Sequence, residues 1–303
     1  MPRETTPQVS VCVITFNQEK YIRECLQSIL DQKTDFDFEV IVGDDCSTDG
    51  TRQIVQEFGC RYPDIVIPLL YLDKVGGTQN YVNSHNLARG KFVAHLDGDD
   101  LALPGKLQAQ ADYLNAHPDC SVVWHRMNVF DDAGTFCVPN LPDLGMYKDG
   151  RVYLSDVLGY GSVSYHSSTM YRSIVRKTRA IEGEALDWSF NVEFLTTGYG
   201  KYLEAVLGKY RYNKNTGVSR AGGGQRKIRR LYASHLEFYL KAFPEFRRLI
   251  FINSILHFLV DTKNLRLSAI YFLKLALKSI SILSVSDFEK ALVRYRRINP
   301  RIL

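Results

Sequence analysis

The chain has 303 residues, an apolar fraction of 45% and a formal net charge of +5 at pH 7. This composition is that of an ordinary globular protein and excludes the disordered and fibrous classes. The opening residues MPRETTPQVS contain no apolar run after a basic residue, so we expect no secretory signal. No stretch of about 18 uncharged apolar residues occurs, so a membrane-spanning helix is not expected.

The six cysteines form no C-x-x-C pair and sit mostly within apolar patterns. This usage predicts reduced, buried thiols in a cytoplasm rather than a disulfide or zinc framework.

The first part of the chain alternates between strand and helix patterns. Strands are predicted at 9–16, 38–45, 65–72 and 90–100, and helices at 18–32 and 47–58. Continuous apolar strands between helices indicate an α/β fold with a mostly parallel sheet covered on both faces. No G-x-G-x-x-G follows the first strand, so a dinucleotide-binding Rossmann domain is disfavoured.

Polar residues follow three of these strands, at 15–17, 44–45 and 97–100. Ligands of such sheets collect at the carboxyl ends of the strands, so the three segments predict one binding crevice.

The later part of the chain has a mixed pattern. Strands are predicted at 120–130 and 162–175, a helix ending at a glycine at 186–200, and a strand pair or edge at 202–213. A basic, glycine-rich hinge at 217–227 then leads to a helical tail. We therefore predict one domain over 1–220 and a helical C-terminal extension over 221–303.

Charge is distributed unevenly along the chain. From residue 225 onward there are 16 Lys and Arg against 5 Asp and Glu, a net +11, which leaves −6 for residues 1–224. Lys274, Lys278 and Ser281 fall on one face of an otherwise apolar helix pattern at 267–285. The basic extension predicts a partner with phosphates, such as an anionic membrane surface, a lipid-linked diphosphate or nucleic acid. A solvated helix face is the alternative.

The stretch LDGDD places three carboxylates, Asp97, Asp99 and Asp100, at the end of a predicted buried strand. Carboxylates this close raise one another's pKa unless positive charge lies between them. Either water screens them in a turn, or a cation binds there.

Four segments together resemble the family 2 glycosyltransferases, whose fold for nucleotide-diphospho-sugars is called GT-A. They are VSVCVITFNQEKYIRECLQSIL, VIVGDDCSTDGT, GKFVAHLDGDD and EALDWSFNVEFLTTGYGKYLEAVLGKYRYNKNTGVS, which match in order and spacing. The resemblance spans roughly residues 8–220. It implies a GT-A domain followed by a C-terminal helical extension.

The resemblance also implies roles for individual residues. LDGDD would be the D-x-D motif, in which Asp97 contacts the ribose or the metal and Asp99 coordinates Mg²⁺ or Mn²⁺. Residues expected to bind the nucleotide sugar are Thr15, Phe16, Asn17, Glu19, Asp45, Asn80 and Asp97. Asp45 would accept a hydrogen bond from the uracil ring, and Asn80 would alternatively cap the helix that follows. His166 and Trp188 are candidate acceptor or diphosphate contacts, with a satisfied core histidine as the alternative for His166.

Asp187 matches the general base of inverting relatives, which removes the proton from the acceptor hydroxyl. The commonest motif has Glu-Asp before the aromatic residue, whereas here Leu186 occupies the Glu position. Glu184 is therefore an alternative base, and a helix N-cap is the alternative role for Asp187.

From this resemblance we predict an inverting, metal-dependent hexosyltransferase that moves a sugar from a UDP-sugar to a hydroxyl. The expected acceptor is a lipid-diphosphate-linked saccharide of surface-polysaccharide synthesis, such as O-antigen or capsule. We expect a cytoplasmic enzyme, peripheral on the inner face of the cell membrane, with Mn²⁺ or Mg²⁺ and without nucleic acid. The rivals are a non-catalytic sugar-nucleotide-binding protein and a nucleotidyltransferase, although ITFNQEKY lacks the glycine-rich phosphate loop of the latter. The sequence does not select the sugar, the linkage or the oligomeric state.

Overall fold

The computed structural model describes residues 6–133, 136–137, 144–161, 164–178, 183–212, 224–282 and 284–298. The chain forms two compact units. The first unit comprises 1–139, 164–179 and 197–212, and the second comprises 140–163, 180–196 and 213–303. The second unit thus takes two segments from the middle of the chain besides the C-terminal region. The division at residue 220 stays a prediction.

The first unit is an α/β sheet with helices. Its elements are β1 (Val9–Thr15), α1 (Ile22–Leu30), β2 (Phe38–Asp44), α2 (Thr51–Arg61), β3 (Val66–Leu70), α3 (Gly77–Leu87), β4 (Phe92–Asp97), β5 (Leu101–Ala102), α4 (Lys106–Ala116), β6 (Cys120–Phe130), β7 (Phe136–Cys137), η3 (His166–Ser168), β9 (Met170–Arg172), η4 (Ser173–Thr178) and β10 (Tyr199–Arg211). The strand order is β3-β2-β1-β4-β9-β6-β10-β5, with β7 beside β6.

The sheet is mostly parallel, as predicted. Strand β1 runs parallel to β2 and β4, β2 to β3, and β6 to β10. Strand β9 is antiparallel to both β4 and β6, and so joins the two parallel halves.

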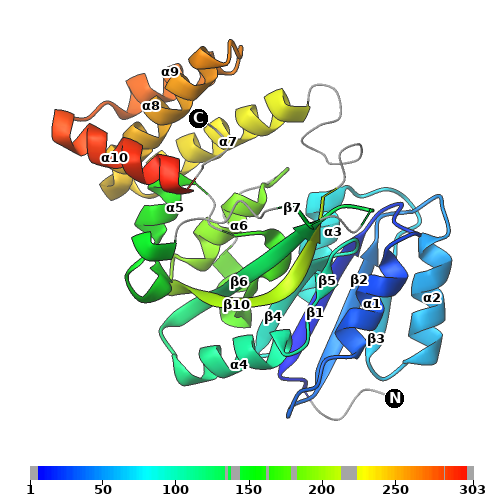
Figure 1. Ribbon diagram of the computed structural model, residues 1–303. Helices are drawn as coiled ribbons and strands as arrows, with labels where there is room; N and C mark the ends of the chain where they lie inside the picture. Colours follow the sequence, from blue (N-terminus) through cyan, green and yellow to red (C-terminus); the bar gives the residue numbers. More distant parts are fainter. Residues whose placement is uncertain are drawn as a thin grey trace. The chain divides into compact units, whose positions relative to one another are not determined.

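Helices cover both faces of this sheet (Figure 1). Val11 and Val13 of β1 belong to one buried core with Ile22 and Leu26 of α1. The alternating neighbour Cys12 faces the other way, where its thiol donates to the carbonyl of Ser84 in α3. Because side chains of a strand alternate between faces, α1 and α3 lie on opposite sides of the sheet.

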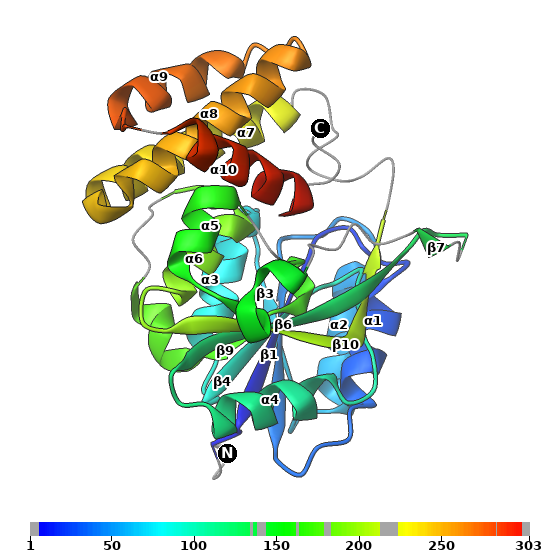
Figure 2. The same cartoon turned by 60° about the vertical axis from the view of Figure 1, so that its left-hand side comes forward.

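The second unit is helical. Its elements are η1 (Leu144–Met146), η2 (Lys148–Gly150), β8 (Arg151–Val152), α5 (Leu154–Tyr160), α6 (Asp187–Phe194), α7 (Gly224–Ala242), η5 (Pro244–Phe246), α8 (Arg247–Lys263), α9 (Ala269–Ser279) and α10 (Val285–Ile298). Helices α7 to α10 pack together (Figure 2). A fully buried carboxylate, Asp261, holds this packing by accepting from Arg229 Nε at 2.6 Å and from Ser268 Oγ at 2.7 Å. Among the described residues, no helix combines the length and apolarity needed to cross a bilayer.

Several predicted elements need correction. Within the described part of the expected strand at 162–175, only β9 is a strand, and the residues on either side of it form the 3₁₀ turns η3 and η4. The helix expected to reach a glycine near 200 ends at Phe194, and the expected strand pair at 202–213 is part of the single strand β10. The predicted buried thiols hold for Cys12, Cys25 and Cys120, whereas Cys60 is exposed. The hinge at 217–227 lies largely outside the described residues.

Candidate functional site

The register of the sheet brings the polar strand ends side by side. Thr15 at the end of β1 is paired with Asp44 at the end of β2, and Ile14 is paired with Asp97 at the end of β4. The three polar segments that follow these strands therefore start from one edge of the sheet. This is the edge at which ligands of parallel sheets bind.

The loop after β1 is tied to the loop after β2. Asn17 has a left-handed backbone, with a φ of 53°, which asparagine tolerates better than most residues. Its Oδ1 accepts from the backbone N–H of Thr48 at 2.8 Å, and the Glu19 carboxylate accepts from the backbone N–H of Gly50. Asn17 and Glu19 thus shape the loops, and their contact with a base or ribose stays a prediction.

Aromatic and hydroxyl groups complete this loop. Phe16 is 37% exposed, and the Lys74 ammonium lies 3.6 Å from its ring centroid. Thr15 is buried, and its hydroxyl donates to Gln18 Oε1 at 2.8 Å. An exposed aromatic ring beside a cation suits both the face of a base and a phosphate.

Asp45 is buried and organises the segment before α3. Its Oδ1 accepts from the backbone N–H groups of Val75 at 2.7 Å and of Gly76 at 3.0 Å. A carboxylate has about four acceptor positions, so these bonds are compatible with a further donor such as a uracil N–H. That contact stays a prediction.

Asn80 lies within α3 rather than before it, so the alternative role of helix cap is wrong. Its amide donates to the Gly43 carbonyl at 2.8 Å, and its Oδ1 accepts from Ser84. A Cβ at Gly43 would overlap this Oδ1, which explains the glycine in a strand interior. Asn80 is thus committed to holding α3 on β2, and its contact with a nucleotide stays a prediction.

The acid cluster of LDGDD carries the electrostatic signature that the sequence suggests. Burial, together with the nearby charge of Asp97, raises the pKa of Asp99 to about 6. Asp100 is fully buried, and its pKa is raised well above the usual range by burial and then by the charges of Asp99 and Asp97. An additional positive charge would be stabilised here, because it would relieve this repulsion.

The protein supplies part of that positive charge itself. Lys106, at the start of α4, is buried and donates from Nζ to the carbonyl of Ser167. Burial lowers the pKa of its ammonium to about 8, against the opposing effect of Asp100. Arg211, at the end of β10, donates from its backbone N–H to Asp100 Oδ1 at 2.7 Å and from Nε to the carbonyl of Asp99 at 3.0 Å. Neither residue was predicted from the sequence.

Asp97 also lies in a group of side chains capable of metal binding. Ligand atoms of His95, Asp97 and His166 lie within 4.8 Å of one another, the one such group among the residues that the structure describes. Asp97 is partly exposed, whereas both histidines are buried. The Asp97 and Asp99 oxygens suit a hard divalent cation, and the raised pKa of Asp99 fits a carboxyl group that lacks a sufficient counter-charge.

The remaining predicted residues lie in the second unit. Asp187 is exposed and is the first residue of α6, whose N-cap is Leu186, so the N-cap role for Asp187 is wrong. Glu184 is also exposed, and its carboxylate forms a 2.6 Å ion pair with Lys227. Trp188 is buried, and its indole N–H donates to the carbonyl of Val157 at 2.9 Å. The roles of these three residues in catalysis or acceptor binding stay predictions.

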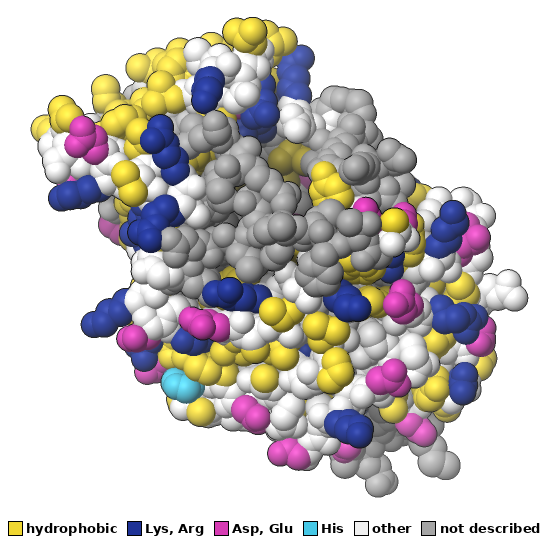
Figure 3. Space-filling view, viewed as in Figure 1, with side chains coloured by type: hydrophobic (Ala, Val, Ile, Leu, Met, Phe, Trp, Pro, Cys, Tyr) yellow, Lys and Arg dark blue, Asp and Glu magenta, His cyan; other side chains and the backbone are white. Residues whose placement is uncertain are grey.

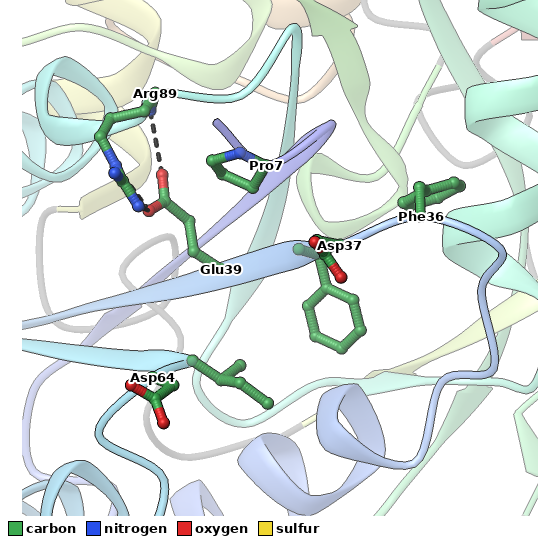
Figure 4. A pocket seen from close by; sticks show the side chains of 8 residues that line it. Pro7, Phe36, Asp37, Glu39, Asp64 and Arg89 are labelled. Atoms are coloured by element: carbon green, nitrogen blue, oxygen red, sulfur yellow. Dashed lines mark hydrogen bonds and ion pairs between the residues drawn. The ribbon is translucent and has the colours of Figure 1, made fainter. Parts of the chain in front are cut away.

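A cavity of about 340 Å³ lies at the opposite end of the strands (Figure 4). Its lining includes Phe38 at the start of β2, Ile65 just before β3 and the Glu39 carboxylate. Glu39 accepts from Ser10 Oγ at 2.7 Å and from the Arg89 guanidinium at 2.7 Å. Because this acid is occupied within the fold and lies away from the carboxyl ends, the cavity is not the candidate site.

The mostly parallel sheet, with helices on both faces and acids at its strand ends, has the GT-A fold. The sequence model of the family described as glycosyl transferase family 2 matches residues 10–177, and the chain belongs to that family.

Two relatives illustrate the match. An uncharacterized protein of Mycobacterium tuberculosis is 32% identical over 67% of this chain, which spans only 58% of that protein's length. The Bacillus subtilis candidate glycosyltransferase EpsE is 32% identical over 68% of this chain and 73% of EpsE.

Two solved structures share the fold. Staphylococcus aureus TarS 1–349 in complex with UDP-GlcNAc has a TM-score of 0.68 at 21% identity, over 97% of this chain and 90% of that one. The mannosyltransferase PcManGT of Pyrobaculum calidifontis, in complex with GDP-Man and Mn²⁺, has a TM-score of 0.58 at 19% identity, over 98% of this chain and 83% of that one.

Proposed function

We propose that the protein is an inverting glycosyltransferase that moves a hexose from a UDP-sugar to a hydroxyl group of an acceptor. One observation carries this proposal. The adjacent ends of β1, β2 and β4 present Thr15, the 44–45 acids and LDGDD at one sheet edge, in a chain of family 2.

In the proposed donor site, each side chain binds the part of the UDP-sugar or ion that its chemistry suits. Asp45 would hold the base, Phe16 and Lys74 would flank it, and Asp97 and Asp99 would hold the divalent ion, Mn²⁺ or Mg²⁺. When bound, that ion would supply positive charge that stabilises the departing diphosphate. Arg211 holds the acid turn through its bond to Asp100, and the Lys106 ammonium interacts with Asp100 through its charge.

The transfer itself needs a base and an open path for the acceptor. The acceptor oxygen forms a bond to the anomeric carbon while the bond from that carbon to the diphosphate breaks, and UDP leaves. We propose that the Asp187 carboxylate takes the proton of the acceptor hydroxyl. Asp187 begins α6, as the acid of the resembling motif begins its helix, whereas the Glu184 carboxylate is paired with Lys227.

We also propose that the second unit brings the enzyme to an anionic membrane surface, where a lipid-diphosphate-linked saccharide is the acceptor. The face of the molecule that carries α9 shows apolar and basic side chains together (Figure 3), and Lys274 is exposed. The apolar members are Leu265, Leu267, Ile270, Leu277, Ile280 and Ile282, each at least 47% exposed. Apolar side chains between cationic ones are typical of helices that bind at the lipid interface. Synthesis of a surface polysaccharide is the role that fits such an acceptor.

A panel of nucleotide sugars tests the donor proposal. UDP-sugars and GDP-sugars are added to the protein with Mn²⁺, and the rise in Tm is followed by hydrolysis and transfer assays. We expect stabilisation by UDP-sugars and turnover of at least one of them. Stabilisation without turnover would favour a non-catalytic binding protein, and stabilisation by GDP-sugars alone would contradict the UDP assignment.

A further inference from the structure

Three buried side chains connect the interior of the first unit to Asp97. Tyr171 lies in β9, His85 in α3 and His95 in β4, and each is at most 2% exposed. Tyr171 Oη lies 2.7 Å from His85 Nδ1, and His85 Nε2 lies 3.1 Å from His95 Nδ1. His95 Nε2 lies 3.1 Å from Asp97 Oδ1. Tyr171, His85, His95 and Asp97 thus form a continuous series of hydrogen bonds, called here the hydrogen-bond chain. It ends on the partly exposed Asp97 carboxylate.

The donor and acceptor capacities of these groups fix the direction of donation along the hydrogen-bond chain. An ionised carboxylate only accepts, so His95 must donate from Nε2. In a neutral imidazole the other nitrogen then accepts, so His95 Nδ1 accepts from His85 Nε2–H. By the same rule His85 Nδ1 accepts from the hydroxyl of Tyr171. With both histidines neutral, every step has one donor and one acceptor, and all donation runs toward Asp97.

The surroundings of His85 favour this neutral arrangement. Burial lowers the pKa of His85 well below its usual value, and the neighbouring His95, His166 and Arg176 act in the same direction. The Tyr81 ring stacks on His85 with centroids 3.7 Å apart, which leaves the imidazole within an aromatic core. A doubly protonated His85 would donate from both ring nitrogens, so that Tyr171 would have to accept, and it would place a charge in this core.

The hydrogen-bond chain and Ser167 together orient the Asp97 carboxylate. The backbone N–H of Asp97 donates to Ser167 Oγ at 2.9 Å, and Ser167 Oγ lies 3.4 Å from Asp97 Oδ2. The side chain is therefore held from one side by His95 and from the other by Ser167. A carboxylate that is already oriented loses less conformational entropy when a ligand binds.

We propose that Tyr171, His85 and His95 are positioning residues that hold the Asp97 carboxylate ready for the donor nucleotide and its divalent ion. This inference rests on the proposed function, because it assigns Asp97 to the donor. The hydrogen-bond chain extends from β9 through α3 to β4. The Tyr171 hydroxyl, which is separated from Asp97 by two histidines, therefore contributes to donor affinity. None of the three side chains touches the donor in this account.

The first experiment determines the direction of donation along the hydrogen-bond chain in the absence of any ligand. Long-range ¹H–¹⁵N NMR spectra of protein labelled with ¹⁵N-histidine report which ring nitrogen carries the proton. The seven histidines are assigned with single variants. We expect both His85 and His95 as neutral Nε2–H tautomers. A neutral Nδ1–H tautomer at His95, or a charged ring at His85, would overturn the proposed chain.

The second experiment measures how much the hydrogen-bond chain contributes to the affinity for UDP. The Kd of UDP in the presence of Mn²⁺ is measured by calorimetry for Tyr171→Phe, which removes one hydroxyl and keeps the ring. We expect a rise of about fivefold, the usual effect of one net hydrogen bond. The matched control is Tyr202→Phe, because Tyr202 is also buried in the sheet but its hydroxyl has no hydrogen-bond partner among the described residues. The control should bind UDP as the wild type does.

Variants at His95 test the end of the chain. We expect His95→Phe to raise the Kd by about 10–100-fold, the range seen when a partner of a metal-binding side chain is removed. His95→Gln places an amide N–H near the position of Nε2, so it should recover part of this loss. A merely structural role would predict that both variants act through stability alone, which their Tm values report.

The outcomes separate the two proposals. If the wild type binds UDP and Tyr171→Phe binds it as tightly as Tyr202→Phe, the positioning role is wrong while the proposed function stands. If the wild type binds no nucleoside diphosphate, the proposed function is wrong, and so is the positioning role of the hydrogen-bond chain. The NMR tautomers would then still decide whether the directed chain exists.

Discussion

The backbone N–H of Arg211 donates a 2.7 Å hydrogen bond to Oδ1 of Asp100, although 111 residues separate the two in the sequence. The Arg211 guanidinium also lies 4.4 Å from the ring centroids of Tyr21 and Phe130. The end of the last strand thus clamps the acid turn that follows β4. Asp100 is therefore a structural acid, and the proposed donor site uses Asp97 and Asp99 instead.

The clamp predicts a loss of stability when Asp100 is removed. Asp100→Ala leaves the buried N–H of Arg211 without its acceptor, which costs about 1–3 kcal/mol in the free energy of unfolding. Asp100→Asn keeps an acceptor oxygen and should be milder. Urea denaturation measures both variants, with exposed Asp64→Ala as the control. Equal stability of Asp100→Ala and the wild type would show that the clamp is unimportant.

The buried lysine predicts a dependence of stability on pH. The pKa of Lys106 is about 8 in the folded chain and 10.5 as an ordinary lysine, so the unfolded chain binds more protons between these values. Stability from this group therefore increases as pH rises above 8, by at most about 1.4 kcal/mol per pH unit. Lys106→Met lacks this group.

The corresponding measurement compares the two proteins directly. The free energies of unfolding of the wild type and Lys106→Met are measured from pH 7 to 9.5, so that other titrating groups cancel in the difference. The difference should move in favour of the wild type above about pH 8. A difference that does not change with pH would contradict the lowered pKa.

The surface around α9 predicts salt-dependent binding to anionic vesicles. Lys274→Glu should weaken co-sedimentation at least about fivefold, because each cation near an anionic surface contributes about 1 kcal/mol. Lys278 is a poorer test alone, since its ammonium forms a 2.5 Å ion pair with Glu237. The matched control is Lys33→Glu, an exposed lysine of the first unit. Absence of wild-type binding would leave the surface to protein packing.

The exposed acid of α6 predicts a separation of chemistry from binding. Asp187→Asn should lower kcat by about 10²–10⁴-fold, the usual contribution of a general base. Its Kd for UDP should stay within about threefold of the wild type, because the base acts on the acceptor in the transition state. Glu184→Gln should remain active. The reverse pattern would place the base on Glu184.

The strand pattern and the acid cluster were predictable from the sequence because both are local. Continuous apolar runs end in polar residues at Thr15, Asp44 and Asp97, and a parallel sheet then places these ends together. The spacing of Ile22, Leu26 and Ile29 likewise predicted a helix with one buried face, although its bounds were too wide.

The supporting residues were harder to predict because their partners are distant in the sequence. Arg211 looks like a surface charge at the end of a strand until β10 pairs beside the acid turn. His85 reads as a polar residue of a weakly amphipathic helix, and only the approach of β4 and β9 buries it between His95 and Tyr171. Asn80 precedes a predicted strand, and nothing local indicates its bond to Gly43.

The most direct test of the proposed metal-dependent transfer is the turnover of Asp99→Ala with a UDP-sugar and Mn²⁺. We expect that the wild type needs a divalent ion and loses its activity in chelator. We also expect Asp99→Ala to turn over at least about 10²-fold more slowly, the scale of a lost charge-stabilising group. If Asp99→Ala transfers the sugar at near the wild-type rate, and chelator leaves both proteins active, the assignment of LDGDD to a catalytic metal is wrong.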